Sequence, residues 1–394
     1  MNVTAVYIHI PFCHEICHYC DFAKMYYHEA IADQYLESLN QEMGMYVENK
    51  PIAVRTVYIG GGTPTSLNPK QLERLLETIS TYINIDQVEE FTIEANPGEF
   101  VEDHVKVMKA YGINRVSLGV QVLDNDYLKQ LNRHHTVEDV NQSVKLLQEY
   151  DLTNISMDFI YSLPGQTLDH FKNTLKQAIA YGLPHYSSYA LQIEPKTVFY
   201  MRYQKGQLHK PVEEVEAKMF TTLIDVMEEN GLSHYEISNF AKPGFESQHN
   251  LTYWANVPYY AFGAGAHGYL DGYRYVNLRP VNHYNDRVIK GEKPILHQEQ
   301  VTLKEKVEEE LFLGLRRRSG VSNCHFQEKF GFSMYEIYQD TIDYLLKKDW
   351  VYVKEDTVAM TRNGMMFGNE VFSEFLIDDH IWESKLSIDS HKGV

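Results

Sequence analysis

The sequence predicts an α/β fold in which a partial (β/α)6 barrel is followed by a small C-terminal α+β domain. Six short runs rich in β-branched and aromatic residues alternate with stretches that carry apolar residues at helical spacing, such as 69–83 and 137–150. The six runs cover residues 4–10, 55–60, 90–96, 115–121, 154–160 and 185–191. Alternating strands and helices form parallel sheets, and right-handed crossovers curl such a sheet toward a barrel. Six units predict a barrel that is only partly closed.

The second half of the chain departs from this rhythm. From about residue 300, an acidic amphipathic helix, two further helical stretches and the hairpin-like run 351–361 predict a winged-helix-like α+β domain. We therefore divide the chain into a barrel (1–235), an aromatic segment that completes the core (236–299), a small C-terminal domain (300–380) and a tail (381–394).

Composition excludes several classes of protein. The chain has 394 residues and a formal net charge of −18, which argues against a nucleic-acid partner because such binding depends on clustered Lys and Arg. We interpret the basic cluster Arg316–Arg318 as a solvated or salt-bridged helix face. Only four cysteines, no secretory signal and no apolar run approaching about 18 residues predict a cytoplasmic protein without a transmembrane segment.

Three of the four cysteines, Cys13, Cys17 and Cys20, form a C-x3-C-x2-C spacing. This spacing favours an iron–sulfur cluster, because thiolates are the usual ligands and a short loop can wrap one cluster. Three thiolates leave one iron of a [4Fe-4S] cluster open, and S-adenosylmethionine (SAM) can chelate that iron for radical chemistry. The alternative is a zinc site, which would need His14 or His18 as a fourth ligand.

The fourth cysteine, Cys324, stands alone far along the chain. We interpret it as a partly buried, inert thiol. The alternative is a fourth cluster ligand.

A glycine-rich turn follows the second predicted strand directly, in the run Gly60–Pro64. It does not fit the dinucleotide pattern G-x-G-x-x-G. Ligands of parallel α/β folds collect at the C-terminal ends of the strands, and glycines let backbone groups approach a ligand closely. Because the cysteine loop follows the first strand in the same way, we expect the loop and the turn to share one site.

Several motifs together resemble the radical SAM superfamily, and more closely its oxygen-independent coproporphyrinogen oxidase-like branch. They are HIPFC, GGGTPT, EANPGE, SLGVQ, LNRHHT and MDFIYSLPGQT, in this order. The resemblance implies a radical SAM barrel with a [4Fe-4S] cluster on Cys13, Cys17 and Cys20.

The resemblance also implies a SAM site at the strand ends. Tyr19 matches an aromatic residue that packs on adenine, and Arg133 would hold the SAM carboxylate. Asp158, a costly charge in an apolar strand, would pair with a ribose hydroxyl or with Arg133. Glu94 would lie near SAM, with an ion pair at the barrel rim as the alternative. The full implied set is Tyr7, Tyr19, Gly61, Gly62, Thr63, Glu94, Gln121, Arg133, Asp158 and Ala190.

A haem site is implied by the run H-N-x-x-Y-W, which contains His249, Tyr253 and Trp254. The run is similar to a motif that marks a haem-binding group within this branch. Imidazole is a natural axial ligand of haem iron, and aromatic neighbours suit a flat apolar macrocycle. We interpret His267, which lies outside the motif, as a surface or structural residue.

Two functions compete on this basis. The first is a haem chaperone that transfers haem to an acceptor protein, with a low-potential electron donor required if SAM is cleaved. The second is a coproporphyrinogen III dehydrogenase. That enzyme has a longer N-terminal extension and a further cysteine where Phe22 stands here. We therefore predict the haem chaperone and assign no catalytic residue.

Overall fold

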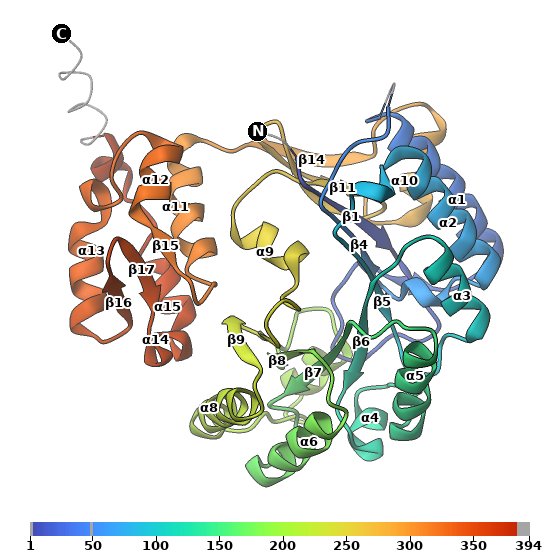
Figure 1. The fold of residues 1–394 in the computed structure, drawn as a ribbon, viewed down its shortest axis with the longest axis horizontal. Helices are drawn as coiled ribbons and strands as arrows, with labels where there is room; N and C mark the ends of the chain where they lie inside the picture. The colour runs from blue at the N-terminus through green and yellow to red at the C-terminus, as the bar shows by residue number, and fades with distance from the viewer. Residues whose placement is uncertain (1–2, 48–49, 384–394) are drawn as a thin grey trace. The chain divides into compact units, whose positions relative to one another are not determined.

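A computed structural model describes residues 3–47 and 50–383 (Figure 1). The chain forms two compact units. Unit 1 contains residues 1–233, 238–249 and 258–299, and unit 2 contains 234–237, 250–257 and the chain from 300 onward. The domain boundaries that we set at 235, 299 and 380 stay a prediction, and the predicted tail lies outside the described residues from position 384.

The curved sheet of unit 1 confirms the six predicted strands, each within one residue of its expected bounds (Figure 1). Neighbouring strands pair in parallel from β1 through β8, so the barrel is built from consecutive strand–helix units. The strands are β1 (Ala5–Ile10), β4 (Thr56–Gly61), β5 (Glu90–Ala95), β6 (Arg115–Gln121), β7 (Ile155–Tyr161) and β8 (His185–Ala190).

Short strands that the sequence did not reveal extend this sheet, and two of them come from the aromatic segment. Strand β11 (Tyr260–Phe262) pairs in parallel with β1, and β10 (Asn239–Ala241) pairs antiparallel with β8. Three residues are too few to show a strand periodicity. The aromatic segment therefore contributes strands to both ends of the row β1–β8.

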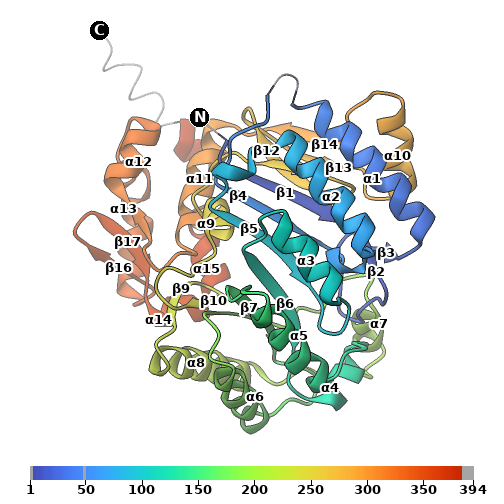
Figure 2. The same cartoon turned by 45° about the vertical axis from the view of Figure 1, so that its right-hand side comes forward.

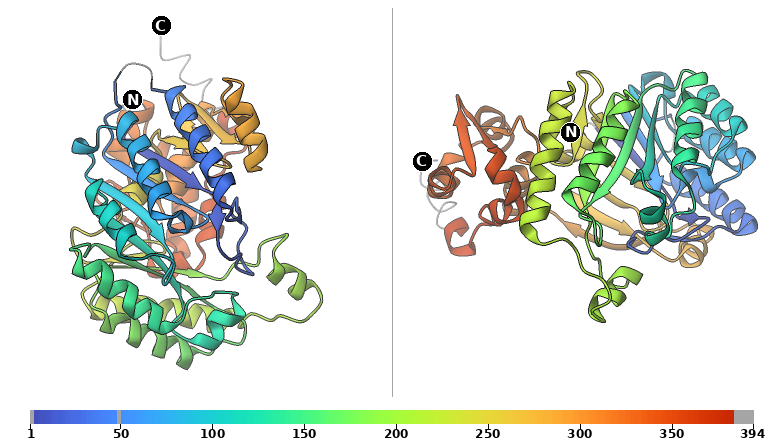
Figure 3. Two further views of the ribbon diagram at one scale, coloured as in Figure 1. Left: turned by 90° about the vertical axis from the view of Figure 1, so that its right-hand side faces the viewer. Right: turned by 90° about the horizontal axis from the view of Figure 1, so that it is seen from below.

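Helices cover the outer face of the sheet (Figures 2 and 3). They are α1 (Glu29–Gly44), α2 (Pro69–Tyr82), α3 (Glu102–Ala110), α4 (Asn125–Gln130), α5 (Val137–Glu149), α6 (Leu168–Ala180) and α8 (Glu213–Glu229). Helix α7 (Val198–Gln204) instead contacts the cysteine loop, where the Phe199 N–H donates to the His18 carbonyl at 3.0 Å. None of the helices described in residues 3–47 and 50–383 is long and apolar enough to cross a membrane.

Helix α2 illustrates how local sequence fixes these elements. Asn68 and Gln71 form a capping box, and Pro69 occupies the first helical turn, where its missing N–H costs nothing. Apolar side chains then recur on one face at Leu72, Leu75, Leu76 and Ile79, and all four are buried. Burial of each contributes about 1.5–3 kcal/mol, so packing on the sheet rather than propensity holds the helix.

A second sheet has three strands, β12 (His267–Leu270), β13 (Tyr273–Asn277) and β14 (Ile295–Gln300). Helix α10 (Val281–Ile289) connects β13 to β14. Glu42 on α1 is fully buried and ties this region to the barrel. Its carboxylate accepts hydrogen bonds from the Gly263 N–H at 2.7 Å, Asn277 Nδ2 at 2.6 Å and the Tyr284 hydroxyl at 2.6 Å.

Unit 2 has the predicted winged-helix-like order. Helix α11 (Leu303–Gly314) is followed by β15 (Val321–Ser322), α12 (Asn323–Phe330), α13 (Tyr335–Lys347), β16 (Val351–Lys354) and β17 (Thr357–Met360). The three strands form one sheet in the order β15-β17-β16. Two short helices, α14 (Arg362–Met366) and α15 (Gly368–Ser373), come after it, and unit 2 also contains most of β9 (Ser233–Glu236).

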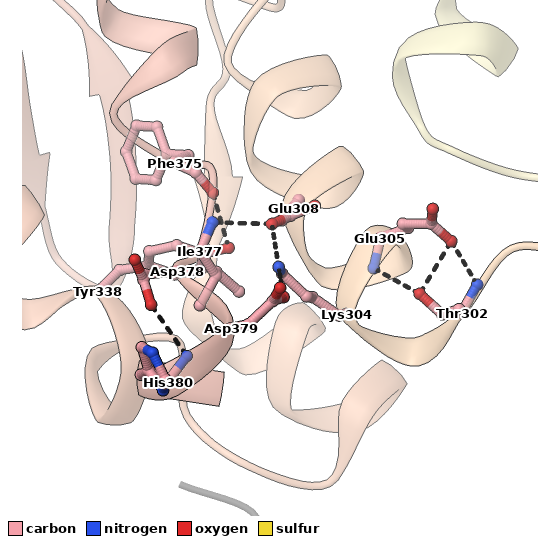
Figure 4. A network of polar contacts seen from close by, with 10 residues as sticks. All are labelled: Thr302, Lys304, Glu305, Glu308, Tyr338, Phe375, Ile377, Asp378, Asp379 and His380. Atoms are coloured by element: carbon pink, nitrogen blue, oxygen red, sulfur yellow. Dashed lines mark hydrogen bonds and ion pairs between the residues drawn. The ribbon is translucent and has the colours of Figure 1, made fainter. Parts of the chain in front are cut away.

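The end of the described chain is tied to unit 2 by polar contacts (Figure 4). Glu308 on α11 accepts a 2.7 Å hydrogen bond from the Ile377 N–H, and the Tyr338 hydroxyl donates to the Phe375 carbonyl at 3.1 Å. Lys304 pairs with Asp379 at 2.5 Å. Residues 375–379 are therefore an integral part of this domain.

The interpretation of Arg316–Arg318 as a solvated helix face is wrong. The three residues follow the end of α11 and are half-buried. The Arg316 guanidinium lies 5.1 Å from the ring centroid of Trp254 and 4.7 Å from that of Phe372. A planar, weakly hydrated guanidinium stacks well on aromatic faces, so the arginine belongs to the packing of unit 2.

Candidate functional site

The cysteine loop leaves the C-terminal end of β1 and returns beside it. Strand β2 (Phe12–Cys13) pairs in parallel with β3 (Met25–Tyr26), and the Tyr27 N–H donates to the Cys13 carbonyl at 2.8 Å. Cys13 ends β2, and the loop between these strands carries the other two predicted ligands, Cys17 and Cys20. Asn132 Nδ2 donates to the Ile16 carbonyl at 2.9 Å, which fixes the middle of the loop.

The three thiols lie in surroundings that suit a metal cluster. Burial raises the pKa of Cys13 to about 12 and raises that of Cys20, and binding of a metal by these thiols would displace their protons. Arg133 Nη1 lies 3.5 Å from Cys17 Sγ, where a cation stabilises thiolate charge. A Cβ at Gly62 would lie 2.9 Å from Cys13 Sγ, so a glycine is needed where the turn passes the loop. Within the described residues no three His, Cys, Asp or Glu side chains gather around a single metal ion, so the three thiols of this loop suit a cluster in which each thiolate would hold a different iron.

Cys324 lies in unit 2 at the start of α12, and its side chain is exposed. Our expectation of a partly buried thiol is wrong. The first turn of a surface helix gives this side chain no cover, and its Sγ lies 3.8 Å from Glu328 Oε1 on the same helix.

Four side chains on the barrel strands keep some solvent-accessible surface although their neighbours along the strand are buried. In each of the strands β1, β4 and β5, one residue keeps accessible surface among buried neighbours, and these residues are Tyr7, Tyr58 and Glu94. In β7, Asp158 is likewise half-buried between buried residues. Three of these four positions are predicted SAM contacts. The hydrogen bond from Tyr58 to Glu94 and the stacking of Tyr7 on Tyr58 place these three side chains on one face of the sheet.

Glu94 is the central carboxylate of this face. The Tyr58 hydroxyl donates to its Oε1 at 2.8 Å, and the Gly61 N–H donates to its Oε2 at 3.0 Å, with Gly61 at a φ of 121°. Burial raises the pKa of Glu94 to about 7. Within the described residues both donors are neutral, so Glu94 is not the rim ion pair that we considered as an alternative.

The partners of Asp158 and Arg133 differ from our expectation. Asp158 accepts hydrogen bonds from the Ser117 and Ser156 hydroxyls, each at 2.7 Å, and Arg133 does not pair with it. Arg133 Nη2 donates to the Gly119 carbonyl at 2.5 Å, and its Nε is buried without a hydrogen-bond partner in the described chain. Serines from two neighbouring strands satisfy the aspartate, which leaves the guanidinium directed at the cysteine loop.

The remaining predicted SAM residues also lie at strand ends or beside the loop. Gln121 ends β6 with a φ of 68°, where the register between β6 and β7 shifts. Thr63 accepts a 2.9 Å hydrogen bond from Asn96 Nδ2, and its hydroxyl lies 3.7 Å from Cys13 Sγ. Tyr19 packs against an apolar cluster that includes Leu131. Ala190 ends β8.

The predicted haem residues lie on helix α9 (Gln248–Trp254). His249 is 0% exposed; its Nδ1 lies 2.9 Å from Thr56 Oγ1, and its ring stacks on Tyr58 with centroids 5.1 Å apart. Burial lowers the pKa of His249 to about 3, which keeps the imidazole neutral. Glu90 accepts the N–H groups of Gln248 and His249 at 2.8 and 2.9 Å, so a carboxylate caps the start of the helix.

The other two motif residues lie one turn further along α9. At 3.6 residues per turn, Tyr253 shares a face with His249, whereas Trp254 lies about 100° further round the helix. Trp254 is the residue whose ring carries the Arg316 guanidinium.

Three residues that contact His249 were missed by our sequence reasoning. Thr56 and Tyr58 lie on β4, two and four positions before Gly60, and therefore on the same face of the strand as Gly60. Glu90 lies on β5, four positions before Glu94 and on the same face. The period of two was the available signal, because it places side chains on the same face of a strand.

The family model for the radical SAM superfamily matches residues 7–178, and the model for the HemN C-terminal domain matches residues 301–367. A protein of Bacillus subtilis named "Heme chaperone HemW" is 44% identical over 376 residues, which cover 95% of this chain and 99% of that protein. The chain belongs to the HemW family.

Another HemW, from Lactococcus lactis, is also 44% identical, over 95% of this chain and 98% of that protein. The solved structure of coproporphyrinogen III oxidase (HemN) from Escherichia coli superposes with a TM-score of 0.81 over 95% of this chain and 90% of that one. At 22% identity this second likeness shows the fold alone. A radical SAM fold implies a [4Fe-4S] cluster and SAM, which favours the cluster over the zinc alternative.

Proposed function

We propose that this protein binds haem and transfers it to an acceptor protein, while carrying a [4Fe-4S] cluster and SAM. The observation that carries the proposal is the similarity to HemW proteins over nearly the whole chain. HemW relatives are named for haem, and here the motif histidine is placed by Thr56, Tyr58 and Glu90.

The cluster and SAM would occupy the end of the barrel described above. When bound, the pair supplies one-electron chemistry. Cys13, Cys17 and Cys20 would hold the cluster, and the Arg133 guanidinium would offset negative charge beside Cys17. Glu94 has lone pairs left after accepting two hydrogen bonds and can accept a further donor from SAM.

Haem would bind at His249. A neutral imidazole is the form of histidine that ligates a metal. Because His249 is buried, haem binding requires the ring to become accessible. A cytoplasmic, reducing setting would keep the cluster thiols free of disulfides, and a low-potential donor protein would supply electrons for any SAM cleavage.

The deciding experiment is an anaerobic haemin titration of the cluster-loaded protein, followed by transfer to a haem-free haemoprotein. In parallel, the protein is incubated with coproporphyrinogen III, SAM and a reductant, and the porphyrins are analysed. Stoichiometric haem binding and transfer without porphyrinogen conversion would support the proposal. Catalytic turnover of coproporphyrinogen would replace it with the dehydrogenase function.

The ligand assignment is tested by His249→Ala, with His267→Ala as the matched control because His267 is exposed on a strand. We expect His249→Ala to weaken haemin binding at least tenfold and to change the haem absorption spectrum, since an axial ligand is lost. The control should behave as the wild type. Equal haemin binding by both variants would contradict the assignment.

A further inference from the structure

One side chain lies between the predicted SAM pocket and the predicted haem ligand. Tyr58, on β4, donates its hydroxyl hydrogen bond to Glu94 Oε1 at 2.8 Å. The face of the same ring stacks on His249, with centroids 5.1 Å apart and an interplanar angle of 28°. Tyr7, another predicted SAM contact, stacks on Tyr58 with centroids 6.2 Å apart and an interplanar angle of 25°. Three rings therefore form a continuous series through the barrel interior.

The close approach of Tyr58 to Glu94 is built into the backbone. A Cβ at Gly60 would lie 2.8 Å from Tyr58 Cε1 and 2.9 Å from Glu94 Cδ. Contacts below about 3 Å do not occur for real side chains without a shift of the neighbour, so a glycine is needed for this pair to meet. Tyr7, Tyr58, Glu94 and His249 all lie in unit 1.

We propose that Tyr58 is a positioning residue that couples the two sites, so that SAM bound beside Tyr7 and Glu94 opposes haem binding at His249. The inference rests on the proposed function, because it takes His249 as the haem ligand.

The direction of the effect follows from what each ligand needs. The haem iron reaches only an accessible ring nitrogen, so the haem-binding state has His249 withdrawn from its stack on Tyr58 and its contact with Thr56. SAM contacts with Tyr7 and Glu94 favour the arrangement in which Glu94 holds Tyr58 against His249. A ligand shifts a conformational equilibrium toward the state that it binds better, and a smaller competent fraction lowers apparent affinity.

The test compares haemin dissociation constants of the cluster-loaded protein with and without saturating SAM. No reductant is added, so that SAM stays intact, and binding is followed in the haem absorption band. Coupling between two sites usually amounts to about 5–150-fold, and we expect SAM to weaken haemin binding by about fivefold or more. Thermodynamic reciprocity requires haemin to weaken SAM binding by the same factor, which equilibrium dialysis with labelled SAM measures independently.

Tyr58→Phe is the informative variant, because it removes the hydroxyl and keeps the ring that packs on His249. We expect the effect of SAM on haemin affinity to fall below about twofold, since the contact to Glu94 is lost. Tyr186→Phe is the matched control. It removes another buried hydroxyl of the same unit, one that donates to the Ala178 carbonyl at 2.8 Å, and it should keep the wild-type ratio.

Several outcomes would overturn the coupling. They are equal haemin affinities with and without SAM in the wild type, tighter haemin binding with SAM, and a SAM effect that survives in Tyr58→Phe. Loss of haemin binding in His249→Ala together with a surviving SAM effect in Tyr58→Phe would contradict the coupling alone. Unchanged haemin binding in His249→Ala would contradict the ligand assignment of the proposed function, and the coupling with it.

Discussion

Two carboxylates in unit 1, Glu42 and Glu94, differ in how completely the protein satisfies them. Burial raises the pKa of each to about 7. Glu42 is 0% exposed and accepts three hydrogen bonds, from a backbone N–H, an amide and a hydroxyl. Glu94 accepts only two, from Tyr58 and Gly61, and keeps some accessible surface.

We interpret this difference as one between a structural acid, Glu42, and a predicted ligand-binding acid, Glu94. A buried polar group that the protein leaves incompletely paired costs free energy unless water or a ligand completes it. The hydrogen-bonding capacity of the Glu42 carboxylate is used by Gly263, Asn277 and Tyr284, so we interpret Glu42 as a structural residue. Glu94 lies among predicted SAM contacts with lone pairs to spare. Four predictions test this comparison.

The largest expected effect is on stability. Glu42→Ala leaves three buried donors without their acceptor, each costing about 1–3 kcal/mol, so we expect the free energy of unfolding to fall by about 3–5 kcal/mol. Denaturant titration measures this change. Glu94→Ala, which frees two donors beside accessible space, should cost clearly less. If both variants lost the same free energy of unfolding, the two carboxylates would not differ in their structural role.

The second effect is a pH dependence. The folded pKa of Glu42 lies above its unfolded value, so its stabilising contribution is present below about pH 4.5 and is lost as pH rises toward 7. We expect this carboxyl to cost the wild type about 2–3 kcal/mol of unfolding free energy between pH 4.5 and 8. Glu42→Gln, which cannot ionise, should show a correspondingly flatter profile. Parallel profiles for both proteins would contradict the assigned pKa shift.

The third effect is on ligand binding. Glu94→Gln keeps the shape of the side chain and removes its charge, so we expect SAM affinity of the cluster-loaded protein to fall about tenfold, or about 1.4 kcal/mol. Equilibrium dialysis measures it. Glu42→Gln is the matched control and should bind SAM within about twofold of the wild type. A control that loses as much SAM affinity would show that the effect is structural.

The smallest effect compares two hydroxyls. Tyr284→Phe removes one of three donors to Glu42 and should lower the free energy of unfolding by about 1–2 kcal/mol. Tyr58→Phe removes a donor to Glu94, which can accept another donor from the space that it lines, and should cost less than about 0.5 kcal/mol. The reverse order would mean that Glu94 is the more strongly structural of the two acids.

Sequence reasoning succeeded where the signal is local. The six barrel strands and the helical segments 69–83 and 137–150 follow from side-chain periodicity, and the cysteine loop follows from its spacing. It failed where a partner comes from elsewhere in the fold. Asp158 was expected to pair with a ribose hydroxyl or with Arg133, yet within the protein it accepts hydrogen bonds from the hydroxyls of Ser117 and Ser156 on its own and the neighbouring strand. Strands as short as β10 and β11 leave no periodic trace.

The sequence by itself determined that this protein has a partial barrel with three cysteines at the end of its first strand, because these features depend on residue type and spacing. Only the tertiary structure decided which buried carboxylates receive a full set of hydrogen bonds from other residues of the chain. Glu42 meets Gly263, Asn277 and Tyr284 across 221, 235 and 242 positions, and Thr56 meets His249 across 193. Hydrogen bonds act over about 3 Å, so such pairs exist only once packing has brought distant strands and helices together.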